Sequence, residues 1–264
     1  MKRAKANYLI QSVVHALDLL EEFRGSTTEL GVTELSNRLN LHKNNVFRLL
    51  ATLETKGYIE QNRQTESYRL GIKALQLGQT YVRQSGFLQQ AKPVLEQIVF
   101  ACGETAYIGA IKGSDAVYLD AVESTQTVRV VNRIGQQVPV YATAIGKAQA
   151  AYMSEEELDK LLPAELQAFT PTTVTDKREF KKLLKKIEAQ GLAIDNEEYE
   201  RDVRCLAAPV HDYTRKVIGA ISISAPAYRM SEERLRKEIV PLLAQGAEQL
   251  SRRLGYEVAL KVAS

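Results

Sequence analysis

Residues 31–60 read GVTELSNRLNLHKNNVFRLLATLETKGYIE. The second half of this stretch predicts a helix over 43–56, because its apolar residues recur at the i, i+3, i+4, i+7 spacing of one buried helical face. A shorter helix capped by Thr33 is expected before it, since two leucines there lie one helical turn apart. The residues at 40–42 form a turn between the two helices, so the stretch predicts a helix–turn–helix.

The face of helix 43–56 opposite its apolar side carries residue types that read DNA. At about 100° per residue, the exposed N-terminal half displays lysine, asparagine and arginine. Asparagine pairs with adenine edges, arginine with guanine and lysine with phosphates, and a phenylalanine on the flank can contact a thymine methyl. Taken alone, this face would also suit a solvated surface helix.

A β-hairpin follows the two helices. Two short strands are expected at 58–61 and 67–70, with Arg63 at the tip of the polar turn, where it can touch a phosphate or a minor groove. A helix–turn–helix followed by a wing is an order that docks in a major groove, so residues 1–70 are interpreted as a winged helix-turn-helix that binds double-stranded DNA. The predicted DNA-binding residues are Lys43, Asn44, Asn45, Phe47, Arg48 and Arg63.

Composition narrows the class of protein. The 264 residues are 45% hydrophobic and carry a net charge of +3, which fits a globular protein and argues against a polybasic nucleic-acid binder. The two cysteines indicate no disulfide framework, and the three histidines lack the spacing of metal ligands. Because the sequence has no apolar run of about 18 residues and no signal peptide, we expect a cytoplasmic protein without membrane partner, metal or cofactor.

A helix over 71–86 is expected to link the winged domain to a second domain at 87–264. Strands and helices follow one another there in an order that predicts an antiparallel sheet flanked by helices, so the whole chain is assigned to the α+β class. The strands expected in this domain cover 105–111, 116–122, 127–132, 206–211 and 217–224. A single helix is expected from Ser231 to Leu254.

Three stretches of the second domain combine small, polar and apolar residues, as ligand sites do. Residues 139–148 form a loop entering a helix, whose free N–H groups can hold an anion. Residues 195–200 are an acidic run followed by Cys205, and Ser222 and Ser224 share one face of an apolar strand. Each stretch also has an ordinary explanation: a capped helix, a solvated loop, a buried thiol, or hydroxyls bonded to backbone.

Six segments are together highly specific for one protein family, although each segment alone is a weak signal. They are GVTELS (31–36), VFRLL (46–50), YATAIGK (141–147), DNEE (195–198), RCLAAPV (204–210) and SIS (222–224). With these segments the chain resembles the IclR family of bacterial transcription regulators over essentially its full length. Segments 133–135 and 143–147 most resemble the branch of that family that answers to ketodeoxygluconate and related sugar acids.

The resemblance implies a GAF-like effector domain, a long linker helix, and dimers that often pair into tetramers. In such relatives a small carboxylate or keto acid lies in one pocket, and its carboxylate meets backbone N–H groups at the positions of Ala144 and Ile145. The effector-binding residues implied here are Thr143, which is expected to cap the helix, Ala144, Ile145, Gly146, Asp195, Cys205, Ser222 and Ser224.

Two places depart from the pattern of the family. Asp202-Val203 stands where Gly-Leu is common, and because glycine allows a positive φ, the loop at Asp202 and the pocket rim are expected to differ. In the helix–turn–helix, His42 stands where a small capping residue is common, and Asn44-Asn45 replaces a typical Ser-Thr. A different operator sequence is therefore expected.

The sequence thus predicts a transcription regulator, a repressor of a catabolic operon controlled by a small carboxylate, keto acid or sugar acid. A homodimer, or a dimer of dimers, would place two recognition helices on a pseudopalindromic operator, and effector binding would change their spacing through the linker helix. One alternative is a GAF-type enzyme, but Cys205 has no resolving partner and no phosphate loop or nucleophile elbow is present, so no catalytic residue is predicted. The other is a DNA-binding protein that senses nothing, which would have little use for Asp195 and the two serines.

Overall fold

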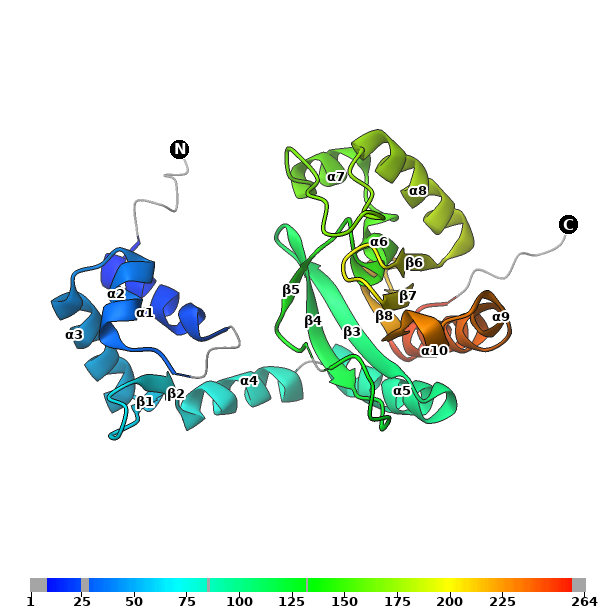
Figure 1. Ribbon diagram of the computed structural model, residues 1–264. Coiled ribbons are helices and arrows are strands. Elements are labelled where there is room, and N and C mark those ends of the chain that lie inside the picture. Colours follow the sequence, from blue (N-terminus) through cyan, green and yellow to red (C-terminus); the bar gives the residue numbers. More distant parts are fainter. Residues whose placement is uncertain (1–8, 25–28, 85, 132, 258–264) are drawn as a thin grey trace, which may run out of the picture. The chain divides into compact units, whose positions relative to one another are not determined.

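The computed structural model describes residues 9–24, 29–84, 86–131 and 133–257. The chain divides into two compact units, Met1–Gln84 and Ser85–Ser264. Within the described residues, the first unit combines helices with a two-stranded hairpin, and the second is built on a six-stranded sheet (Figure 1). The predicted α+β class, a winged helix-turn-helix plus an antiparallel sheet flanked by helices, is confirmed.

The first unit packs its helices and its hairpin around a small apolar core. Its elements are α1 (Gln11–Glu21), η2 (Glu22–Arg24), α2 (Val32–Leu39), α3 (Lys43–Thr55), β1 (Ile59–Gln61), β2 (Tyr68–Leu70) and α4 (Ile72–Gln84). The predicted apolar face of α3 is buried through Val46, Leu50 and Leu53. β1 pairs with β2 in antiparallel register, and Leu30 adds a bridge to Tyr68. The helix pair and the wing therefore share one core.

The turn between α2 and α3 fixes where the second helix begins. The predicted cap at Thr33 is wrong: Gly31 is the N-cap residue, because its carbonyl already accepts the N–H of Leu35 at 3.0 Å. After α2, Asn40 adopts a left-handed φ of 51°, which asparagine tolerates better than most residues. The hydroxyl of Ser36 then donates to the carbonyl of Leu41 at 2.6 Å and ties the turn to α2.

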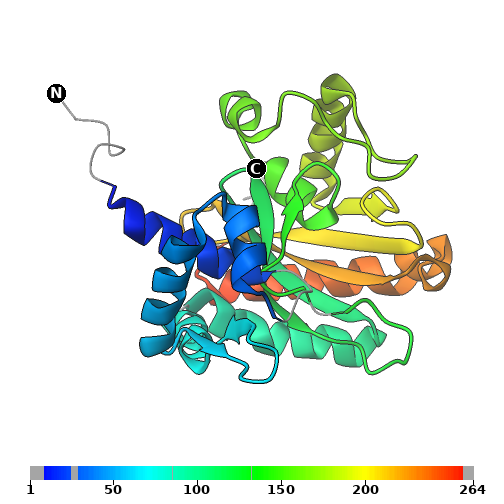
Figure 2. The ribbon, with the colours of Figure 1, turned by 60° about the vertical axis from the view of Figure 1, so that its left-hand side comes forward.

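The second unit has its helices on both faces of the antiparallel sheet. The strands are β3 (Thr105–Lys112), β4 (Asp115–Val122), β5 (Gln137–Pro139), β6 (Ala193–Asn196), β7 (Val203–His211) and β8 (Val217–Pro226), in the spatial order β5-β4-β3-β8-β7-β6. The helices are α5 (Gly86–Cys102), α6 (Ala144–Ala150), α7 (Glu155–Leu161), α8 (Lys177–Gln190), η3 (Ala227–Arg229), α9 (Glu232–Arg234), η4 (Leu235–Ile239) and α10 (Val240–Arg253). α5 and α10 cover one face, and α6 covers the other with α7 and α8 beyond it (Figures 1 and 2).

The strand expected at 127–132 is not formed over residues 127–131, which run as an irregular loop, and Asn132 lies outside the described residues. Carbonyl groups of this loop accept hydrogen bonds from side chains and not from the backbone of a neighbouring strand. Thr105 donates to the carbonyl of Val130 at 2.8 Å, and the hydroxyl of Tyr107 donates to the carbonyl of Val131. The edge position beside β4 is taken by the unpredicted strand β5. The segment is thus held by β3 as a cover over the sheet.

The helix expected from Ser231 to Leu254 is interrupted. The helix begins at Ser231 as predicted, with the Ser231 hydroxyl accepting the N–H of Arg234 at 3.2 Å, but α9 then passes into a π-helical turn, η4, before α10. Pro241 stands at the start of α10. Because proline has no N–H to continue the i→i−4 ladder, the wider turn before it accommodates the missing bond.

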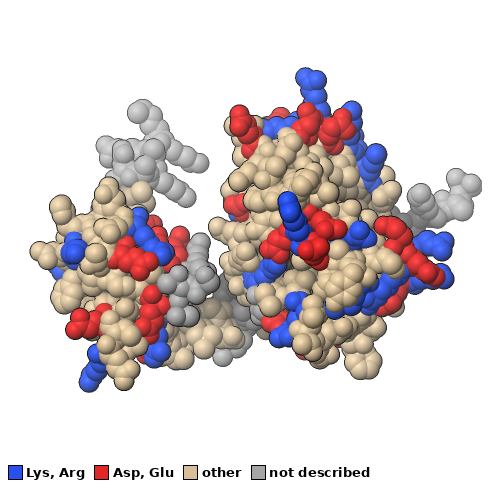
Figure 3. Space-filling view, viewed as in Figure 1, with Lys and Arg blue, Asp and Glu red and all other residues tan. Residues whose placement is uncertain are grey.

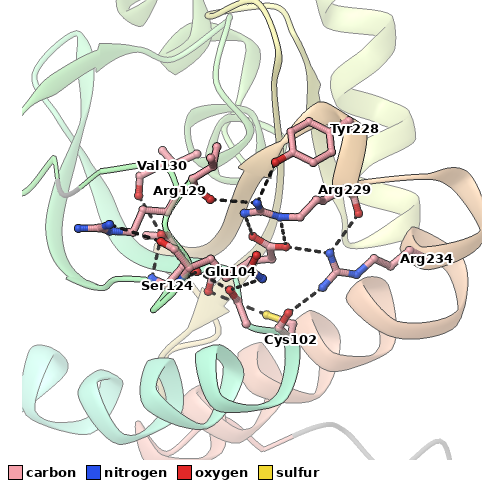
Figure 4. Close-up of polar contacts among 12 residues, drawn as sticks. Cys102, Glu104, Ser124, Arg129, Val130, Tyr228, Arg229 and Arg234 are labelled. Atoms are coloured by element: carbon pink, nitrogen blue, oxygen red, sulfur yellow. Dashed lines mark hydrogen bonds and ion pairs between the residues drawn. The ribbon is translucent and has the colours of Figure 1, made fainter.

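A buried carboxylate, that of Glu104, joins the first strand of the second unit to the segment that follows its last strand. Glu104 is fully buried between α5 and β3 and receives two hydrogen bonds from Arg229, at 2.8 and 2.6 Å, and one from Arg234 at 2.8 Å. Figure 4 shows both guanidinium groups turned toward this carboxylate. Arg234 also donates to the carbonyl of Cys102 at 2.7 Å. Charge-assisted bonds of this kind are the strong ones, so Glu104 locks the C-terminal helices to the sheet.

The same cluster holds the loop at 123–131. Arg229 donates to the carbonyl of Val128 at 2.9 Å, and the hydroxyl of Ser124 donates to the carbonyl of Gly103 (Figure 4). Gly103, which accepts the bond from Ser124, directly precedes Glu104, and Thr105, which directly follows it, donates to the carbonyl of Val130. The loop that covers one end of the sheet is therefore positioned by side chains of β3 and of the C-terminal segment.

Replacing Glu104 by glutamine is expected to destabilise the second unit by about 3–5 kcal/mol, because two partly buried arginines lose their shared counter-charge. The matched control is Glu248→Gln, whose pair with Arg252 is exposed on α10 and is worth at most about 1 kcal/mol. Equilibrium unfolding in urea, followed by circular dichroism, measures both. Equal stability of the two variants would show that the Glu104 cluster does not hold the unit together.

Candidate functional site

The predicted DNA-binding side chains lie on the outside of the first unit. Lys43, Asn44, Asn45 and Arg48 are exposed on α3, and Phe47 is 57% exposed beside them. Arg63 is exposed in the turn between β1 and β2. Positive and negative side chains are interspersed on the face of the molecule visible in Figure 3. The basic members of the predicted set are Lys43 and Arg48 on α3 and Arg63 in the hairpin turn.

The N-terminus of α3 is open for an anion. His42 occupies the N-cap position with an extended backbone, and within the described residues its side chain makes no capping hydrogen bond. Its carbonyl accepts the N–H groups of Asn45 and Val46, at 2.9 and 3.1 Å. The N–H groups at the very start of α3, before Asn45, point away from the helix. The helix dipole favours a phosphate at this end.

In the second unit, the register of four strands sets polar side chains in one row. Asp195 of β6 lies opposite Cys205 of β7, Cys205 opposite Ser224 of β8, and Ser224 opposite Thr105 of β3. The next row on the same face pairs Ser222 with Tyr107. This face carries the apolar core that includes the first turn of α6. The antiparallel pairing thus gathers residues that are about 120 positions apart in the chain.

A small pocket opens on this row. It is lined by Tyr107, Tyr118, Val130, Arg133, Asp195, Tyr199, Glu200, Val203, Cys205 and Ser224. The free space between these side chains is about 10 Å³, which is room for about one water molecule. The pocket is therefore formed but nearly filled by its own side chains.

Asp195 is the buried acid of the pocket. One of its carboxylate oxygens accepts the N–H of Glu198 at 2.7 Å and that of Tyr199 at 3.4 Å. Burial raises the pKa of this carboxyl to about 7, although the charge of Lys147 acts in the opposite direction. Asp195 can therefore gain or lose its proton near neutral pH, and a protonated carboxyl is both a donor and an acceptor for a bound molecule.

Cys205 is not a reactive thiol. It is buried beside Ser224, and burial raises its pKa to about 12, with Asp195 adding to the shift. A nucleophilic or redox-active cysteine needs a depressed pKa, so this thiol can serve only as a neutral contact. Among the described residues, no group of three or more His, Cys, Asp or Glu is placed to hold a metal ion.

A buried ion pair joins α6 to the turn that follows β6. The ammonium of Lys147 is fully buried and donates to Glu198 at 2.6 Å, and the other carboxylate oxygen of Glu198 has no hydrogen-bond partner among the described atoms. The hydroxyls of Thr170 and Thr173 donate to the carbonyl of Glu198, at 3.2 and 2.6 Å. The turn that carries Glu198 is thus fixed on two sides.

The structure brings together only some of the predicted effector-binding residues. Asp195, Cys205 and Ser224 line the pocket, whereas Ser222 is buried one row away. Ala144, Ile145 and Gly146 form the first turn of α6 in the neighbouring core, with Thr143 at the N-cap position. Thr143 does not cap with its side chain, because its hydroxyl donates to the carbonyl of Pro139 at 2.8 Å. The N–H groups at the start of α6 are left for another acceptor.

The loop at Asp202 keeps a left-handed backbone. Asp202 has a φ of 61°, the conformation that glycine would favour at this position. Its N–H donates to Glu197 at 2.9 Å, and its carbonyl accepts the N–H of Ala227 at 2.7 Å. These two bonds hold an aspartate in this conformation, so the altered backbone expected at this position is not found.

Most of the pocket lining was missed by sequence reasoning. Tyr107, Tyr118 and Tyr199 come from strands or turns whose sequences signal only burial, and the two rings of Tyr107 and Tyr118 lie 4.8 Å apart. Arg133 and Glu200 are 67 residues apart and form a bidentate pair over the pocket. These contacts depend on which strands pair and on where the loops run in space. Neither can be read from a short stretch of sequence.

Comparison with known proteins identifies the family. The model of the IclR helix-turn-helix domain matches residues 12–63, and that of the bacterial transcriptional regulator IclR C-terminal domain matches residues 79–252. The chain belongs to the IclR family. It is 37% identical to the HTH-type transcriptional regulator XynR of Escherichia coli and 34% identical to KdgR of the same organism, each over 94% of this chain, and covers 98% and 94% of them. These relatives agree with the branch that the sequence indicated.

A solved structure supports the assignment. The IclR of Thermotoga maritima superposes with a TM-score of 0.76 at 32% identity, covering 93% of this chain and 99% of that one. IclR-family proteins are DNA-binding transcription regulators and not enzymes, which confirms the prediction of a non-enzymatic function. In the described part of this IclR-family protein, no helix is long and apolar enough to span a membrane.

The stability of this IclR-family protein is expected to fall between pH 4 and pH 7 through Asp195. Its carboxyl binds a proton more tightly in the folded chain, with a pKa of about 7, than in the unfolded chain, so folding takes up a proton in this range and the stabilisation is lost as pH rises. The variant Asp195→Asn, which mimics the protonated form, should lack this slope and gain up to a few kcal/mol relative to the wild type by pH 8. Urea unfolding at several pH values measures the difference, and parallel pH profiles for the two proteins would contradict the raised pKa.

Proposed function

We propose that this IclR-family protein is a repressor of a catabolic operon that binds a pseudopalindromic operator as a dimer and is controlled by a small organic acid. The acid is a carboxylate, keto acid or sugar acid bound in the second unit. The observation that carries the proposal is the presence, in one chain, of a helix with an exposed polar face, α3, and of a separate pocket lined by polar side chains, two acids and one arginine.

The DNA-binding part rests on the geometry of α3. Asn44, Asn45 and Arg48 stand outward from a helix whose opposite side is locked in the core. These residue types make bidentate contacts with adenine and guanine edges. Lys43 at the open N-terminus and Arg63 on the wing supply phosphate contacts. Phe47, exposed on the flank, is assigned to a thymine methyl.

The dimer rests on apolar side chains that the first unit leaves uncovered. On α1, Val13 and Leu17 lie one turn apart and are 51% and 56% exposed. On α4, Ile72, Leu75 and Leu77 are 57–64% exposed. Such a concentration of apolar surface on two helices of a small unit marks an interaction site, and a second copy of the chain gives the two-fold symmetry that a pseudopalindrome needs. Pairing of such dimers into tetramers belongs to the same proposal.

The effector site rests on the pocket and on the first turn of α6. Asp195, Cys205, Ser222 and Ser224 offer polar contacts that are already buried on one sheet face. Ala144 and Ile145, next to Thr143 and Gly146, start a helix that lacks a side-chain cap from Thr143, so their N–H groups can donate to an oxygen of the acid. Effector binding need only favour one arrangement of the dimer by a few kcal/mol to release the operator.

Removal of the base-reading arginine should weaken operator binding. For Arg48→Ala we expect a loss of about 1–3 kcal/mol on an operator selected in vitro with the full-length protein, and relaxed specificity at one base pair. Arg63→Ala should weaken binding on all sequences and lower the slope of log affinity against log salt by about one. Arg178→Ala, on the exposed side of α8, is the control. Unchanged affinity for Arg48→Ala would rule out α3 as the reading helix.

The sensor function is tested by ligand-dependent melting and operator release. Small carboxylates, keto acids and sugar acids are screened by thermal shift, and those that stabilise the protein are added to the operator complex. We expect Asp195→Ala and Ser222→Ala to lose the shift, and Ser114→Ala, on the exposed β3–β4 turn, to keep it. Acids that bind tightly without changing operator affinity would refute the sensor function.

A further inference from the structure

The mouth of the pocket is closed by one ion pair. The guanidinium of Arg133 donates to both carboxylate oxygens of Glu200, at 2.9 and 2.5 Å. The side chain of Arg133 is 14% exposed, whereas that of Glu200 is 41% exposed. Arg133 is therefore the inner partner of the pair and Glu200 the outer one, and both are part of the pocket lining.

Arg133 is held in place by the backbone around it. The carbonyl of Arg133 accepts the N–H of Gln136 at 2.9 Å, and the N–H of Gly135 donates to the carbonyl of Tyr118 on β4 at 2.8 Å. Glu200 sits in the turn between β6 and β7, with nearly half of its side chain in water. Water can hydrate Glu200 once it leaves the pair, but it has less access to Arg133.

The charges of the pocket make Arg133 its anion site. Of the described residues that line it, Arg133 is the one that carries a positive charge, and Asp195 and Glu200 are the acids. A planar guanidinium grips a carboxylate with two parallel bonds. With Glu200 bound there, the free space of about 10 Å³ admits no organic acid. A ligand must displace Glu200, and only a ligand with its own acidic group restores the counter-charge that a poorly hydrated guanidinium needs.

We infer that an acidic group of the effector takes the place of Glu200 on Arg133, and that Glu200 is an internal competitor that occupies the anion site of the empty pocket. This inference rests on the proposed sensor function and adds Arg133 to its effector contacts. It restricts the effector to acids that are ionised at neutral pH. The corresponding alcohols and polyols leave Arg133 without a counter-charge and therefore do not open the pocket.

The inference is tested without knowing the effector, by chemical rescue. In Glu200→Ala the competitor is gone and Arg133 is unpaired, so formate or acetate should bind in its place. We expect the full-length variant to melt below the wild type and to regain about 2–4 °C when chloride is replaced by formate at equal ionic strength. The wild type should not respond, because Glu200 still fills the site. Melting is followed by circular dichroism.

Two controls separate this effect from a general effect of the salt. Glu123→Ala removes the carboxylate partner of Arg129, a pair in which both side chains are more than one-third exposed, and should show no gain in formate. The double variant Arg133→Met, Glu200→Ala should lose the rescue. The inference is overturned if Glu200→Ala responds to formate no more than Glu123→Ala does, or if the double variant is still rescued.

A second experiment, on acid affinity and operator release, distinguishes failure of the inference about Arg133 and Glu200 from failure of the proposed sensor function. For any acid that releases the operator from the wild type, Glu200→Gln should raise its affinity, and Arg133→Met should lower it by about 30-fold or more. If the acid releases the operator equally well from Arg133→Met, the sensor function stands and the inference fails. If formate rescues Glu200→Ala but no acid changes operator affinity, Arg133 is an anion site and the sensor function fails.

Discussion

The pairing of β7 with β8, continued by β6 and β3, is the constraint on which the pocket of the second unit depends. Side chains alternate between the two faces of a strand, so Cys205 and Ser224 share a face with Asp195 only in the observed register. A shift of one residue would turn Leu206 and Ile223, now packed on the opposite face, toward the pocket. Burial on both faces fixes this register, because α5 and α10 cover one side and α6 the other. The polar row is therefore a consequence of apolar packing around it.

Three carboxylates of the second unit, those of Glu104, Glu198 and Glu200, form ion pairs that differ in their exposure to water. This difference separates the ion pairs that hold the fold from the one that a ligand can exchange. Glu104 is fully buried and shared by two arginines, so it keeps one partner if either arginine moves away. Lys147 and Glu198 are also buried, with exposures of 0% and 10%, and they fix α6 to the turn after β6. The pair of Arg133 and Glu200 has one partner in water. Breaking a buried pair costs about 3–5 kcal/mol, whereas an exposed partner is readily hydrated, so the pair at the mouth is the one that a ligand can exchange.

The sequence predicts best what local spacing controls. The spacing of Val46, Leu50 and Leu53 predicts helix α3 and its buried face. The side chains that point outward follow from the same spacing, because a helix with 3.6 residues per turn places them on the opposite face. The strand expected at 127–132 was wrong because Val128 and Val130 look like strand residues, while their carbonyls are taken by Arg229 and Thr105, which lie far along the chain or across the sheet. Thr143 was misread as a side-chain cap for a similar reason, since its hydroxyl is used by Pro139. The prediction of effector-binding residues rests mainly on family resemblance, and Arg133 and Glu200, 67 residues apart, carry no local signal that pairs them.

In the proposed sensor, a pocket closed by its own ion pair would change how the protein responds to the concentration of an acid. The apparent affinity for an acid is its intrinsic affinity multiplied by the fraction of molecules in which Glu200 has left Arg133. Acids that bind weakly and are present at low concentration would therefore leave the pocket shut, and the response threshold would be set by the strength of one bidentate pair and not by the fit of the ligand alone. Because Glu200 lies in the turn that also carries Glu198 and the left-handed Asp202, its displacement acts on a segment already held by hydrogen bonds at both ends, to Asp195 of β6 and to the N–H of Asp202. Such a segment moves between discrete arrangements more readily than it deforms gradually, which is the property that a switch between two states of a regulator requires.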